Sequence, residues 1–101
     1  MDELDWLQAF YAEHCNGSWE QHYGLSLDTL DNPGWLLQVD LADTELADKP
    51  FVAVEIERSD TDWLDCHLSE QQFVAAGGPK NLRELLLIFR AFVEKPAPAS
   101  P

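Results

Sequence analysis

Residues 19–41 read WEQHYGLSLDTLDNPGWLLQVDL, and this segment predicts a β-hairpin. Apolar and polar residues alternate on both sides of a central Asp-Asn-Pro-Gly sequence, which is the period of a half-buried strand. Pro33 has the φ that position i+1 of a type II turn requires, and Gly34 tolerates the positive φ of position i+2. We therefore expect two strands within residues 19–41, joined by Asp31-Asn32-Pro33-Gly34 in a loop of about four residues.

The alternation separates an apolar face from an acidic one. Trp19 and Trp35 fall on the apolar side, where tryptophan more often packs in a core. The polar side carries the carboxylates of Glu20, Asp28 and Asp40. One face of the sheet should therefore be buried while the other remains polar.

Helices are predicted at both ends of the chain. Residues 2–15 begin with Asp2 as N-cap and end at Asn16-Gly17, because glycine tolerates the left-handed conformation just after a helix. Asn81 and Glu84 resemble a capping box, which begins a second helix that ends near Lys95. Each helix has an apolar stripe. The stripes are Leu4, Leu7, Tyr11, His14 and Cys15, widened by Trp6 and Phe10, and then Leu82, Leu85, Leu86, Phe89, Phe92 and Val93.

Two more strands are predicted between the hairpin and the second helix, at Phe51–Arg58 and Trp63–Leu68. Alternation assigns their side chains to two faces. Residues 69–80 are expected to lack regular structure, with an apolar plug followed by the breaker Gly-Gly-Pro. The inward set is Val52, Val54, Ile56, Leu64, Cys66 and Leu68, the outward set includes Glu55, Glu57, Trp63, Asp65 and His67, and the plug is Phe73 and Val74.

These elements predict an α+β fold. Short connections favour a four-stranded antiparallel meander, and its single apolar face requires the N-terminal and the C-terminal helix to pack on that face. The length predicts a single domain over residues 1–95, and the Pro/Ala-rich residues 96–101 are expected to form a disordered tail.

Charge is the unusual feature of the composition. Nineteen acidic and six basic residues give a net charge of −13, and residues 80–101 hold four of the bases but only two of the acids. Such a field repels nucleic acid and anionic lipid and attracts basic partners. The alternative is a solvated acidic surface that only maintains solubility.

The sequence lacks known catalytic signatures, including the Walker loop and the Gly-x-Ser-x-Gly, His-Glu-x-x-His and Cys-x-x-Cys motifs. Cys15 and Cys66 fall in apolar stripes, where free cysteine packs as a small hydrophobe. We therefore expect no catalytic residue, no metal and no cofactor. The alternative from another class is a small thiol enzyme or hydrolase that uses Cys66 and His67. The acidic N-terminus and the absence of a long apolar run favour a cytoplasmic protein with reduced thiols.

The candidate binding residues lie on the predicted polar face. Trp63 falls there beside Asp65, and an aromatic side chain among carboxylates suits a protein interface that receives Lys and Arg. The alternative is an edge tryptophan covered by a loop. The predicted partner-binding set is Glu20, Asp28, Asp40, Glu55, Glu57, Trp63 and Asp65.

Two motifs carry a family resemblance, Cys15-Asn16-Gly17 with Trp19-Glu20, and Thr29-Leu30-Asp31-Asn32-Pro33-Gly34-Trp35. Further matching residues are Trp6-Leu7, Tyr11, Tyr23-Gly24, Asp40-Leu41, Thr44, Phe51, Asp62-Trp63, Cys66, Phe73, Gly77-Gly78-Pro79 and Asn81-Leu82. With these residues, the chain resembles the immunity protein 53 family of bacterial polymorphic toxin systems over about residues 4–93.

The resemblance implies a small cytosolic protein that binds and blocks a cognate toxin. Combined with the charge, it predicts stoichiometric inhibition, in which the acidic face docks on a basic domain, and a nuclease toxin fits best. An acidic adaptor for a partner unrelated to toxins is a further alternative.

Overall fold

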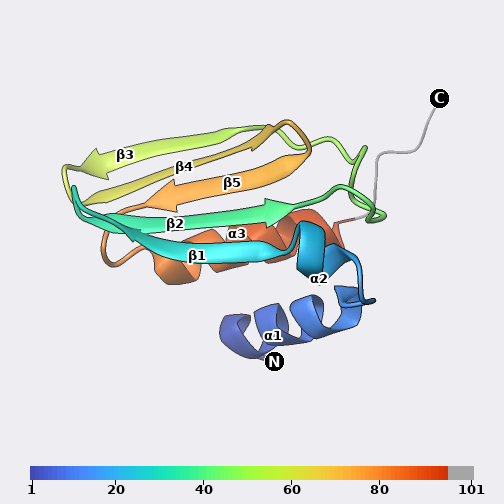
Figure 1. Cartoon of the computed structure of the whole chain (residues 1–101). Helices are drawn as coiled ribbons and strands as arrows, with labels where there is room; N and C mark the ends of the chain where they lie inside the picture. Colours follow the sequence, from blue (N-terminus) through green and yellow to red (C-terminus); the bar gives the residue numbers. More distant parts are fainter. Residues whose placement is uncertain (96–101) are drawn as a thin grey trace.

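The computed structural model describes residues 1–95 as a five-stranded sheet with helices packed on one side (Figure 1). The predicted tail, 96–101, lies outside the described residues. Every neighbouring pair of strands is antiparallel, and the strand order is β1-β2-β5-β4-β3. The elements are α1 (Glu3–His14), α2 (Trp19–His22), β1 (Leu25–Leu30), β2 (Gly34–Asp40), β3 (Val54–Ser59), β4 (Asp62–Ser69), β5 (Gln72–Gly77) and α3 (Leu82–Glu94).

The α+β class and the two terminal helices are confirmed, but the prediction of a four-stranded meander is wrong. Residues 72–77, predicted as an irregular plug, form the central strand β5 between β2 and β4. In β5, Phe73, Ala75 and Gly77 are buried, while the residues between them are half-buried. The chain therefore crosses from β2 to the far edge of the sheet before it returns through β3, β4 and β5.

The first predicted strand begins too early, because residues 19–22 form the short helix α2. Side-chain hydrogen bonds explain this departure. The Asn16 Oδ1 atom accepts from the backbone amides of Ser18 and Trp19, at 2.9 and 3.0 Å. Trp19 is nevertheless in the core, as predicted, with 1% of its surface exposed. Its Nε1 atom donates to the carbonyl oxygen of Asp40 at 3.0 Å, which ties α2 to the end of β2.

The hairpin between β1 and β2 is confirmed, but its predicted type II turn is wrong. The Asn32–Pro33 peptide bond is cis, and Gly34 does not have a positive φ. Gly34 is required for a different reason. A Cβ atom at this position would lie 2.3 Å from the carbonyl oxygen of Gly77, so the two chains approach too closely for a side chain.

An aromatic core fixes both terminal helices to the same face of the sheet, as predicted. The Phe73 ring of β5 lies 5.0 Å from the Phe89 ring of α3, and Phe89 lies 5.0 Å from Phe10 of α1. These three residues are almost fully buried, so they connect sheet, α3 and α1 in one apolar cluster. Leu37, Val39, Leu64, Cys66 and Leu85 are also buried in this cluster.

Some residues predicted as core are exposed. Leu4 and Tyr11 face solvent, because α1 turns the stripe that contains Leu7 and Phe10 toward the sheet and α3. Val52 is 88% exposed, since it precedes β3, which begins at Val54. Ile56 of β3 is 38% exposed, which reflects its position on an edge strand.

A polar cluster anchors the start of α3 to the β3–β4 hairpin. The predicted capping box is wrong in its geometry, because Asn81 makes no side-chain cap to α3. Instead, the Asn81 Nδ2 atom donates to Asp62 and Glu84, at 2.9 and 2.8 Å. The Arg58 Nη2 atom donates to the same two carboxylates, at 2.8 and 2.7 Å. Hydrogen bonds from Arg58 and then from Asn81 hold the pKa values of Asp62 and Glu84 below their ordinary values.

The close approach of Gly34 and Gly77 predicts that alanine destabilises the protein more at position 34 than at position 17. Gly34→Ala should lower the free energy of unfolding by about 3 kcal/mol or more, because its Cβ atom would clash with backbone rather than with a movable side chain. Gly17→Ala is the matched control, since Gly17 has a positive φ but open space around it, and it should cost about 1 kcal/mol. Urea denaturation measures both values, and equal costs would contradict the packing argument.

The hydrogen bonds from Arg58 to Asp62 and Glu84 predict that part of the folding stability is lost at acidic pH. Since the pKa values of Asp62 and Glu84 are lowered in the folded state, their contribution to stability is present above about pH 4 and is lost as the pH falls further. Arg58→Met should therefore reduce the loss of unfolding free energy between about pH 5 and pH 2. Urea denaturation at several pH values tests this, and an unchanged pH dependence would refute it.

Candidate functional site: the open face of the sheet

Five strands contribute to one face that the helices leave uncovered (Figure 1). The strand registers align one residue from each strand across this face, from Asp28 on β1 to Glu55 on β3. Between them lie Leu36, Ala76 and Asp65, in that order. The centre of the row is apolar and half-buried, whereas its two ends carry exposed carboxylates.

Four of the predicted binding residues come together at one end of this face. Glu55 pairs with Asp65, and Glu57 pairs with Trp63, across the β3–β4 ladder. All four line a hollow of about 310 Å³, together with residues of the β3–β4 turn. Trp63 is half-buried and the three carboxylates are exposed, so the hollow combines an aromatic wall with a negative rim. We call Glu55, Glu57, Trp63 and Asp65 the acidic hollow.

The remaining predicted residues lie elsewhere. Asp28 is on the same face but on the opposite edge strand, β1. Asp40 lies at the end of β2, where its carboxylate accepts the backbone amide of Ala42 at 3.0 Å.

The prediction that Glu20 lies on the sheet is wrong, because α2 carries it. Its carboxylate accepts hydrogen bonds from the backbone amides of Asn16, at 2.9 Å, and Gly17, at 2.8 Å. Hydrogen bonds from backbone amides, first its own and then that of Asn16, lower the pKa of Glu20. This geometry gives Glu20 a role in holding the turn before α2.

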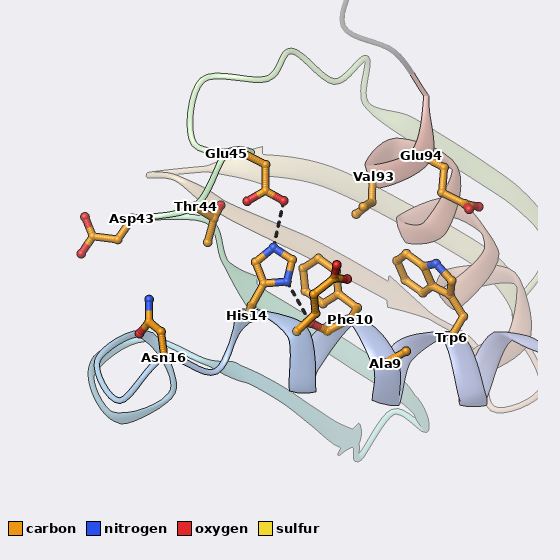
Figure 2. A pocket seen from close by; sticks show the side chains of 11 residues that line it. Trp6, Ala9, Phe10, His14, Asn16, Asp43, Thr44, Glu45, Val93 and Glu94 are labelled. Atoms are coloured by element: carbon orange, nitrogen blue, oxygen red, sulfur yellow. Dashed lines mark hydrogen bonds and ion pairs between the residues drawn. The ribbon is translucent and has the colours of Figure 1, made fainter.

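A second cavity, of about 560 Å³, lies between the ends of α1 and α3 and the connection after β2 (Figure 2). Within it, His14 bonds to the carbonyl oxygen of Phe10 through Nδ1 at 2.8 Å and to Glu45 through Nε2 at 2.9 Å. The two ring nitrogens therefore link His14 to its own helix and to the connection after β2. Only 12% of the His14 side chain is exposed, and the pair fastens the connection to α1.

Sequence reasoning missed this pair, because 31 positions separate His14 from Glu45. Partial burial raises the pKa of Glu45, but hydrogen bonds from its own amide and from His14 outweigh that effect and lower it. The carboxylate is therefore charged at neutral pH, and the arrangement serves the attachment of the connection.

The structure separates the two residues of the alternative thiol site. Cys66 and His67 are consecutive on β4, and their side chains lie on opposite faces of the sheet. Cys66 is fully buried, and burial, with the nearby Asp65 charge, raises the pKa of its thiol to about 12. A thiol nucleophile requires a lowered pKa and access to substrate, so this geometry opposes that chemistry.

Within residues 1–95, His, Cys, Asp and Glu side chains do not gather in groups of three that could hold a metal ion. None of the helices described there is both long and apolar enough to span a membrane.

Fold and site together define a small α+β protein with one sheet face that no described helix covers and with three carboxylates beside Trp63 at one end of that face. The immunity protein 53 family matches residues 4–94, and the chain therefore belongs to this family, as its sequence motifs indicate. No curated protein and no solved structure matches the chain.

The burial of Cys66 predicts unequal thiol reactivity. In the native protein, iodoacetamide should modify the half-buried Cys15 much faster than Cys66, because Cys66 is inaccessible and its thiol remains protonated. Mass spectrometry after timed alkylation measures both rates, and unfolding in urea should make them similar. Rapid native modification of Cys66 would contradict the assignment of this residue to the core.

Proposed function

We propose that this chain is an immunity protein that binds a cognate bacterial toxin domain and neutralises it by stoichiometric inhibition. Membership of the immunity protein 53 family supports the general role. The chain would act in the cytoplasm of the cell that makes the toxin or of its kin. Inhibition would last only while the protein is bound to the toxin, and it would require one immunity protein for each toxin domain.

The acidic hollow is the observation that carries this proposal. Three carboxylates surround a half-buried tryptophan on a face that no described helix covers. A tryptophan that becomes desolvated at the centre of an interface is a frequent source of binding energy. The carboxylates around it can pair with Lys and Arg and exclude partners of like charge.

A basic toxin domain is the partner that this surface favours, and a nuclease is the preferred class. A nuclease holds the phosphate backbone with positive side chains, so an acidic protein can occupy that surface in place of the nucleic acid. The net charge of −13 increases the rate of encounter with such a partner. The same charge opposes binding to nucleic acid and to anionic membranes.

Charge reversal in the acidic hollow tests the proposal. The partner is the toxin domain encoded in the adjacent reading frame, and its affinity is measured by isothermal titration calorimetry. Changing Glu55, Glu57 and Asp65 together to Lys should weaken binding by about a hundredfold or more, because attraction becomes repulsion. Binding of the unchanged protein should also weaken as salt is raised.

A second triple variant controls for net charge. Changing Glu13, Asp48 and Glu94 to Lys alters the net charge by the same amount, but these exposed residues do not line the acidic hollow. This variant should retain most of the affinity. Equal losses in both triple variants would contradict a localised acidic interface, and no loss in either would refute the proposal.

A further inference from the structure

The edge strand β3 lies between two hollows of different chemistry. On the open side is the acidic hollow, of about 310 Å³. On the helix side, an apolar groove of about 540 Å³ runs between the start of β3 and α3. Phe51, Val52 and Val54 form one wall of this groove, and Ile88 and Phe92 form the other. Among residues 1–95, no further strand lies beyond β3.

Backbone hydrogen bonds determine which groups of β3 point out of the sheet. The Gly78 amide donates to the Trp63 carbonyl at 3.1 Å, so the backbone groups of Trp63 point toward β5. The backbone N–H and C=O groups of successive residues in a strand point to opposite sides. Those of Leu64 therefore point toward β3, where they face Ile56. It follows that the amides and carbonyls of Glu55 and Glu57 point away from β4, along the edge.

Along β3, acidic and apolar side chains alternate between the two faces of the sheet. Glu55 and Glu57 project to the open side, whereas Val54 and Ile56 project to the helix side. A strand added at this edge would have the same period of two. Its residues on the open side would meet carboxylates, and those on the helix side would cover Ile56 and the apolar groove.

We propose that β3 is a docking edge for an extended segment of the partner protein, in which Lys or Arg alternates with apolar residues. The segment would add to the sheet as a sixth strand, with backbone hydrogen bonds to Glu55 and Glu57. This inference rests on the proposed function, since it assigns the way in which the toxin domain engages the acidic hollow.

Charge decides between the possible occupants of this edge. A second copy of the chain would bring its own Glu55 and Glu57 near those of the first, and like charges on paired strands are destabilising. Carboxylates on an edge strand also discourage pairing between identical molecules. A basic segment removes this repulsion. The other edge, β1, has one carboxylate, Asp28, and does not border the acidic hollow.

Proline substitution at one position separates strand addition from charge attraction. Glu55→Thr removes the carboxylate but keeps the outward amide, whereas Glu55→Pro removes both. An edge strand tolerates proline where the amide points outward. Binding to the toxin domain from the adjacent reading frame should be about tenfold weaker for Glu55→Pro than for Glu55→Thr, since a partner carbonyl loses its donor.

The opposite edge supplies a matched control. The Asp40 amide donates to the Gly24 carbonyl at 3.0 Å, so the alternation turns the Thr29 amide of β1 outward. Thr29→Pro should therefore leave toxin binding unchanged. Equal binding by Glu55→Pro and Glu55→Thr would overturn the proposal, as would a loss with Thr29→Pro as large as that with Glu55→Pro.

A peptide experiment does not depend on the toxin or on a variant that folds. The probe is an end-capped peptide, Lys-Val-Lys-Val-Lys-Val-Lys, and the control has the same composition in the order Lys-Lys-Lys-Lys-Val-Val-Val. The alternating peptide should bind the unchanged protein about tenfold more tightly. It should slow hydrogen exchange of the Glu55 and Glu57 amides, measured by NMR, and leave that of Thr29 unchanged.

The two experiments fail in different ways. If the unchanged protein does not bind the toxin domain, the proposed function fails, and the peptide experiment alone decides strand addition. If the toxin binds but the two peptides bind equally, or if the Glu55 and Glu57 amides gain no protection, the sixth strand is refuted while the immunity function remains.

Discussion

The pairing of β2 with β5 is the constraint on which the rest of the structure depends. It joins the β1–β2 hairpin to the β3–β4–β5 meander and places Phe73 at the centre of the sheet. Phe73 then meets Phe89 of α3, which in turn meets Phe10 of α1. The pairing also brings Gly34 against Gly77, so it leaves no room for a side chain at position 34.

This arrangement makes the two faces of the sheet unequal. The aromatic core uses both terminal helices on one face, and no described helix remains for the other. Because β5 occupies the centre, β3 lies at an edge, with Glu55 and Glu57 beside Trp63 and Asp65 of β4. The edge position and the uncovered face together create the surface that we assign to the toxin.

Alternation and helix signals predicted the terminal helices, the one-sided sheet and the inward position of Cys66, because these depend on local spacing. The strand at residues 72–77 was missed, since its Ala-Ala-Gly ending lacks the β-branched residues typical of strands. At α2, the Asn16 side chain overrides the apparent alternation around Trp19. The alternation of side chains along β3 and β4 correctly placed the four residues of the acidic hollow on the open face. Glu20 was wrongly placed on the sheet, because α2 was not predicted. The His14–Glu45 pair had no signal in the sequence.

The central claim is that the partner occupies the open face at the acidic hollow. It is tested most directly by mapping amide chemical-shift changes in the ¹⁵N-labelled protein as the unlabelled toxin domain is added. The account predicts that the largest changes fall on Glu55, Glu57, Trp63 and Asp65, with little change along α1. Changes concentrated on α1 and around His14, with none at the acidic hollow, would contradict it.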